Sequence, residues 1–189
     1  ANEFIITTPF AASALYAEDP KILDDPRIAT LNTPWQQRTM MASRDQAAGG
    51  GRGGRGGRGG RGGGGGGGGL QKEEEALLGM LHGGGSVILG TDSPLAGLAI
   101  LNHLGLRAEV KYGFQPWEAL QTATILPARV LGYSKDLGSV EAGKLADLVF
   151  VSGEPLKDIK DVAKVQQVMV DGRVFTIPEL TAPFARKDP

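Results

Sequence analysis

An apolar run that ends on a single carboxylate constrains the fold of this chain more than any other feature. Residues 86–94 read Ser-Val-Ile-Leu-Gly-Thr-Asp-Ser-Pro, so a stretch typical of a buried strand leads to Asp92. Amphipathic segments that favour helices precede and follow this run, which is the repeat of a parallel sheet or barrel. In such folds the chemistry lies at the carboxyl ends of the strands. Asp92 is therefore the first candidate for a functional residue.

Residues 49–69 contain only glycine and arginine, with Arg52, Arg55, Arg58 and Arg61 at a period of three. This stretch cannot form a core and is predicted to be a linker or insert. Without its arginines the basic side chains fall from 20 to 16, against 21 acidic ones. The remainder is mildly acidic, which disfavours general binding of nucleic acids.

Cysteine is absent, so disulfides, thiolate metal sites and cysteine nucleophiles are excluded. Neither a signal peptide nor an apolar run of about 18 residues is recognisable, so a soluble protein without membrane association is predicted. The compartment stays open between cytoplasmic and periplasmic or secreted.

Apolar periodicity and turn signals predict α/β repeats that give way to antiparallel strands. Asp171-Gly172 is the strongest hairpin signal, Thr33 can cap a helix, and Asp25-Pro26 indicates a turn. Lys72 and residues 73–75 are expected on the exposed face of their helix. Strands are expected at 4–8, 86–90, 146–151, 165–170 and 173–177, and helices at 11–16, 34–48, 70–81, 98–111, from 116 and from 127.

Several motifs follow one another in the second half of the chain. They are Gly-Thr-Asp-Ser-Pro at 90–94, Pro-Trp-Glu-Ala-Leu at 116–120, Ala-Thr at 123–124, Pro-Ala at 127–128, Leu-Gly at 131–132 and Leu-Gly-Ser-Val-Glu-Ala-Gly-Lys-Leu-Ala-Asp-Leu-Val at 137–149. This series, within residues 70–177, resembles the carboxyl-terminal part of the metal-dependent amidohydrolases. The imidazolonepropionase and dipeptidase-like branch is the most similar, and residues 1–48 resemble the family more loosely.

The resemblance implies an α/β fold that combines the last strands of an incomplete (β/α)8 TIM-like barrel with the carboxyl-terminal half of a small β-sandwich. By this analogy the chain divides into a penultimate strand with its loop and helix at 1–48, the Gly/Arg linker or insert at 49–69, the last barrel strand and following helices at 70–134, sandwich strands at 135–177 and a tail at 178–189.

The resemblance also implies hydrolysis of amide, cyclic amide or dipeptide-like C–N bonds with one or two divalent metal ions, zinc being favoured. Asp92 would be a metal ligand and the general base that takes the proton from the attacking water. A divalent metal lowers the pKa of bound water towards about 7, and a carboxylate can pass the proton to the leaving nitrogen. No substrate-binding residue and no other cofactor is assigned.

The family's metal-binding histidines come mostly from strands that this chain lacks. His82 precedes the strand at 86–90 and is expected at its opposite end from Asp92, and His103 is expected to be an ordinary helix residue. The chain is therefore expected to be a fragment, inactive alone, that needs the missing amino-terminal barrel portion or a partner chain. The complete enzyme is expected to be a homo-oligomer that acts on a small amide or peptide.

Alternative interpretations stay open. The chain could be a noncatalytic scaffold derived from the barrel, or the Arg-Gly-Gly segment could bind RNA, although no aromatic residue accompanies it. Ser93 has no histidine to activate it as a nucleophile. Lys144 and Asp147 are expected to stabilise the junction between barrel and sandwich, and Trp35 and Trp117 to be packing residues.

Overall fold

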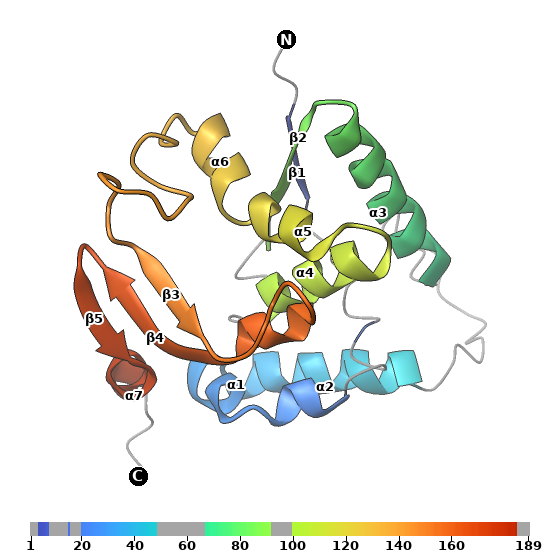
Figure 1. Cartoon of the computed structure of the whole chain (residues 1–189). Helices are drawn as coiled ribbons and strands as arrows, with labels where there is room; N and C mark the ends of the chain where they lie inside the picture. Colours follow the sequence, from blue (N-terminus) through green and yellow to red (C-terminus); the bar gives the residue numbers. More distant parts are fainter. Residues whose placement is uncertain (1–3, 8–14, 16–19, 49–66, 92–99, 185–189) are drawn as a thin grey trace.

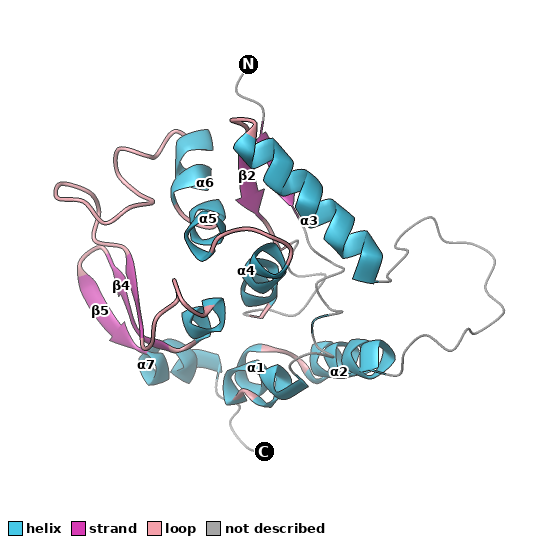
Figure 2. Cartoon of the chain, turned by 45° about the vertical axis from the view of Figure 1, so that its right-hand side comes forward, coloured by secondary structure: helices cyan, strands magenta, loops and turns pink. Residues whose placement is uncertain are grey.

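The computed structural model describes residues 4–7, 15, 20–48, 67–91 and 100–184. Within them lie two separate sheets, and helices α4 (Leu101–Lys111) and α5 (Pro116–Thr122) lie between these sheets (Figures 1 and 2). The chain is therefore of mixed helix and sheet structure, as predicted. None of the helices in the described ranges has both the length and the apolar composition needed to cross a membrane.

The first sheet consists of two parallel strands, β1 (Phe4–Thr7) and β2 (Ser86–Leu89). Their register runs from Phe4 opposite Ser86 to Thr7 opposite Leu89. The backbone N–H of Gly90 then donates to the carbonyl oxygen of Thr7 at 2.7 Å, which extends the pairing by one bond. Because the strands are parallel, their carboxyl ends lie at the same edge of the sheet.

Four helices contact β2: α3 (Gly67–His82), α4, α5 and α6 (Ile125–Val130). A core of apolar side chains fills the space between them, and its fully enclosed members include Val87 and Phe114. Helix α4 approaches β2 closely at Gly105, where a β-carbon would lie 2.5 Å from Cδ1 of Leu89. These contacts fix the position of β2.

Three sequence predictions about exposure were wrong. Glu74 is only 2% exposed, because it lies four residues after Leu70 and three before Leu77, on the stripe of α3 that packs inward. Trp35 and Trp117 were expected to pack, yet they are 60% and 52% exposed. Helix α3 also begins at Gly67, so the last glycines of the 49–69 segment are helical.

A layer of helices formed by residues 20–48 lies beside α4 (Figure 1). It contains the 3-10 helix η2 (Pro20–Asp24), α1 (Pro26–Leu31) and α2 (Pro34–Ala48). The predicted turn at Asp25-Pro26 is in fact the start of α1, since the Asp25 side chain caps the helix and Pro26 occupies its first position. Apart from Leu15, the predicted helix at 11–16 lies outside the described residues.

The second sheet is antiparallel and has the order β3 (Leu148–Val151), β4 (Val165–Val170) and β5 (Arg173–Thr176). The 3-10 helix η3 (Ile159–Ala163) joins β3 to β4. Asp171 and Gly172 form the predicted hairpin turn, with φ of 48° and 75°. The predicted tail begins instead with α7 (Ile177–Thr181) and the 3-10 helix η4 (Ala182–Phe184), because Thr176 and Glu179 form a capping box.

Candidate functional site

The carboxyl edge of the β1–β2 sheet is the candidate site. Thr7 is buried at this edge, and Thr91, which is partly buried, ends the described segment that contains β2. Asp92 follows Thr91 directly in the sequence. Asp92 and Ser93 both lie outside the described residues, so the roles considered for them stay predictions.

His82 lies at the other end of β2. It is the last residue of α3, four positions before β2 begins, and its Nε2 lies 2.8 Å from Oε1 of Glu118 in α5. His82 therefore lies at the amino end of β2, while its expected separation from Asp92 stays a prediction because Asp92 is outside the described residues. The contact between His82 and Glu118 supports the start of α5, because the same Glu118 carboxyl accepts a hydrogen bond from the backbone N–H of Gln115 in the capping box of that helix.

Burial alone would raise the pKa of the Glu118 carboxyl. The hydrogen bonds from the Gln115 backbone and from His82 outweigh this effect, so that the pKa of Glu118 is lowered overall. His82 therefore helps to keep Glu118 ionised at the start of α5.

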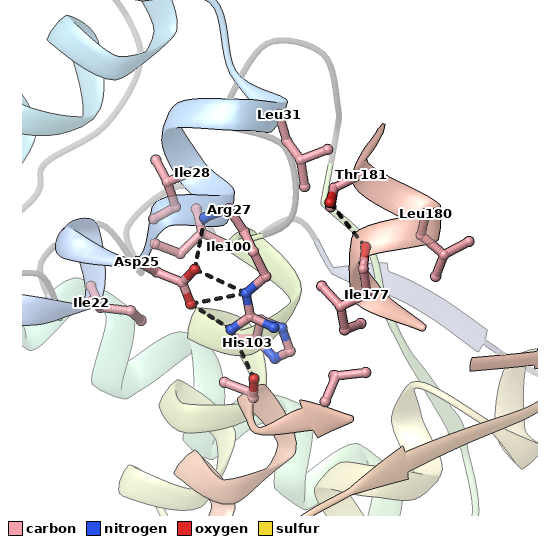
Figure 3. Close-up of a pocket in the computed structure, with 12 residues that line it drawn as sticks. Ile22, Asp25, Arg27, Ile28, Leu31, Ile100, His103, Ile177, Leu180 and Thr181 are labelled. Atoms are coloured by element: carbon pink, nitrogen blue, oxygen red, sulfur yellow. Dashed lines mark hydrogen bonds and ion pairs between the residues drawn. The ribbon is translucent and has the colours of Figure 1, made fainter. Parts of the chain in front are cut away.

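His103 lies in the first turn of α4 and lines an apolar cavity of about 230 Å³ (Figure 3). The prediction that it is an ordinary helix residue missed this cavity, because the cavity's other walls come from distant parts of the chain. Much of the lining is aliphatic, and its members from α1, α7 and β4 are Ile28, Leu31, Val165, Ile177 and Leu180.

The polar wall of this cavity carries no net charge at neutral pH. Nε of Arg27 donates to Oδ1 of Asp25 at 2.9 Å, and Nη2 of Arg27 donates to the carbonyl oxygen of Ala163, also at 2.9 Å. The hydrogen bond from Arg27 holds the pKa of Asp25 below its usual value. Burial, followed by the nearby positive charge of Arg27, lowers the pKa of His103, so the imidazole stays neutral.

The described residues do not fit a catalytic metal ion. Such an ion generally needs three protein ligands and an open position. Nowhere in the described ranges do three or more histidine, aspartate or glutamate side chains come together in a group that could hold a metal. Near His103, the guanidinium of Arg27 would also repel a cation. A metal bound near Asp92 would need ligands other than those described.

Sequence reasoning missed a buried polar cluster between three helices. Glu109 of α4 and Thr122 of α5 are enclosed and hydrogen-bonded to each other, and Glu74 of α3 lies near them. The signal was present in the spacing, since Glu109 follows Gly105 and Leu101 at intervals of four on the buried face of α4.

Lys144 and Asp147, which were predicted to stabilise the junction between barrel and sandwich, make contacts around β3 and the β4–β5 hairpin. Nζ of Lys144 donates to the carbonyl oxygen of Ser134 at 2.8 Å, within the loop between α6 and β3. Oδ1 of Asp147 accepts from the backbone N–H of Asp171 at 2.7 Å, at the turn of the β4–β5 hairpin. These contacts hold the loop and the hairpin in place.

Residues 23–175 match the model of the amidohydrolase family. Over 74 residues the chain is 43% identical to an adenine deaminase of Moorella thermoacetica, a match that covers 39% of this chain and 11% of the deaminase. Over 103 residues it is 34% identical to an imidazolonepropionase of Shouchella clausii, covering 50% of this chain and 22% of the relative.

A solved structure of a Xaa-Pro dipeptidase with methionine bound in its active site matches over 90% of this chain and 34% of its own, with a TM-score of 0.53 and 22% identity. At this identity the likeness concerns the fold alone. In all three comparisons the chain spans only a small part of the relative's own length. The family match over residues 23–175, which agrees with the motif series, shows that the chain belongs to the amidohydrolase family.

Proposed function

We propose that this chain is the carboxyl-terminal portion of an enzyme that hydrolyses C–N bonds in amides, cyclic amides or dipeptide-like substrates. Membership of the amidohydrolase family supports this class of reaction. The relatives by sequence include an adenine deaminase and an imidazolonepropionase, which differ in substrate. What they share is therefore the hydrolysis of a C–N bond, and we propose the same type of reaction for this chain.

The parallel register of β1 and β2 is the observation that carries the proposal. It brings two strand ends to one edge, and Asp92 follows only two residues after Gly90, the last residue bonded across the pair. In parallel α/β folds the functional side chains gather at this edge. We assign to Asp92 the role of general base towards the attacking water and of one ligand to a divalent metal, with zinc favoured.

When bound, such a metal would lower the pKa of its water to about 7 and polarise the substrate carbonyl. The part of this chain would be to accept the water proton on the Asp92 carboxylate and deliver it to the leaving nitrogen. The remaining ligands would come from a missing barrel portion or a partner chain.

Exposed apolar residues on β1 support the need for such a partner. Phe4, Ile5 and Ile6 are 50%, 45% and 59% exposed, and β1 pairs only with β2 among the described strands. An apolar strand with an open edge is a template for a further strand. We infer that a parallel strand of the missing portion covers this edge in the complete enzyme.

Replacing Asp92 by asparagine in the assembled enzyme tests the proposal. We expect kcat for amide or dipeptide hydrolysis to fall by about 10²–10⁴-fold, the usual contribution of a general base, while circular dichroism stays unchanged. The control is Asp24→Asn, because Asp24 is an exposed aspartate of η2 and should leave turnover unaffected. Unchanged turnover in Asp92→Asn would overturn the assignment, and an assembled protein without C–N hydrolysis would favour the noncatalytic scaffold.

A further inference from the structure

Two buried glutamates between α3, α4 and α5 have no role in the proposed site. Glu109 is 1% exposed and Glu74 is 2% exposed, and Thr122 beside Glu109 is fully buried. The helices that carry these residues all contact β2. Carboxyl groups rarely occupy such positions unless they are paired or protonated.

The hydrogen bonds around Thr122 indicate that Glu109 carries a proton. Oγ1 of Thr122 lies 2.7 Å from the carbonyl oxygen of Ala119, and 3.0 and 2.9 Å from the two carboxyl oxygens of Glu109. A threonine hydroxyl has only one proton to donate. In a helix this proton commonly goes to the carbonyl of the preceding turn, here Ala119. The bond between Thr122 and Glu109 then needs a proton from the carboxyl group, which a neutral glutamic acid supplies.

The electrostatic surroundings agree with this geometry. Burial raises the pKa of Glu109 to about 8, and the charge of Glu74 adds to the rise. A hydrogen bond donated by Thr122 to the carboxylate would oppose it, but the single hydroxyl proton of Thr122 is also directed at the carbonyl oxygen of Ala119. Burial also raises the pKa of Glu74 to about 7, with a further contribution from Glu73. Oε2 of Glu74 is enclosed and has no hydrogen-bond partner among the described residues. A neutral acid tolerates such a position far better than a carboxylate does.

Within the part of the chain that the structure describes, the elements packed around this cluster supply no compensating cation. Glu118 of α5 is paired with His82 of α3, and β2 has no titratable side chain. No described lysine, arginine or histidine is among the groups that shift the pKa of Glu74 or Glu109. On the side of α4 that faces η3, a separate cavity is lined by Arg107, Lys111, Asp158 and Lys160.

We propose that Glu74 and Glu109 form a pH-sensitive lock: as neutral acids they allow α3, α4 and α5 to pack together, and their ionisation in mildly alkaline solution loosens this packing. In the unfolded chain both carboxyls ionise around their ordinary pKa of 4.5, whereas in the folded chain they keep their protons up to a pKa of about 7 to 8. Between these values the folded chain binds more protons than the unfolded one, so stability falls as the pH rises. For each such carboxyl, the unfolding equilibrium constant rises about tenfold per pH unit in this window.

Carbon NMR of the glutamate-labelled chain tests the lock directly. We expect two carboxyl carbons to titrate between about pH 6 and 9, and Glu109→Gln to remove one of them. Glutamine is a suitable replacement, because its amide can donate to Thr122 as the neutral acid does. If every glutamate carboxyl of the unmodified chain titrates near 4.5, the proposal is overturned, whether or not the variant folds.

Urea unfolding between pH 5.5 and 7 measures the consequence for stability. The unfolding equilibrium constant of the unmodified chain should rise more than tenfold over this interval, and that of Glu109→Gln should rise at least fivefold less. The control is Glu75→Gln, which changes an exposed glutamate of α3 and should follow the unmodified chain. An equal pH dependence in Glu109→Gln and the unmodified chain would contradict the lock.

Discussion

Replacing Gly138 by alanine should destabilise the chain more than the same change at Gly132. Both glycines have positive φ, of 92° and 82°, so alanine meets similar backbone strain at each, about 1–2 kcal/mol. At Gly138 the new β-carbon would also lie 2.8 Å from Cβ of Ala128 and from Cα of Ile125 in α6. At Gly132 nothing lies within 4 Å. Since atoms so close to the backbone cannot rotate away, we expect an additional cost of about 1–3 kcal/mol at Gly138.

Urea unfolding of the unmodified chain and both variants measures this difference. Thermal unfolding should show it as a fall in Tm of about 2–4 °C for each kcal/mol in a chain of this size. The comparison tests whether the loop between α6 and β3, which contains the start of the 137–149 motif, rests on α6 as the structure has it. Equal losses of stability in Gly138→Ala and Gly132→Ala would refute this packing.

Two further substitutions test the core and the contact at the amino end of β2. Leu104→Ala should lower the free energy of unfolding by about 2–5 kcal/mol, because Leu104 is completely buried, while Leu131→Ala at a residue 67% exposed should cost little; similar losses in both would contradict the described core. His82→Ala should raise the pKa of Glu118 measured by NMR, although only in part because the bond from the Gln115 backbone remains, and an unchanged pKa would show that His82 does not act on Glu118.

Local signals predicted those elements in which sequence and tertiary structure agree. The aliphatic run before Gly90 forms β2, as predicted. Asp171-Gly172 forms the turn of the β4–β5 hairpin, because both residues tolerate positive φ. Asp25-Pro26 was taken as a turn, although the same pair serves equally well as the cap and first residue of a helix. Likewise α6 begins at Ile125, two residues before Pro127, since proline is tolerated throughout the first turn of a helix.

Longer-range features could not be predicted in the same way. Glu74 is buried because of how α3 packs against α4, whereas its charged side chain predicted a place on the exposed face of the helix. The cavity beside His103 joins segments more than 60 residues apart in the sequence, such as α4 and α7. For the candidate site, the motif series predicted the family and the strand that leads to Asp92. The substrate could not be predicted, because one fold supports many reactions through residues outside the shared motifs.

The position of the metal in the assembled enzyme tests the central proposal most directly. Anomalous X-ray scattering from crystals of the zinc-loaded enzyme would locate the ion independently of any activity. We predict a carboxylate oxygen of Asp92 at the length of a zinc–oxygen bond, about 2.0–2.2 Å. A fully occupied zinc site whose ligands do not include Asp92, or an Asp92 side chain directed into bulk solvent, would contradict the account.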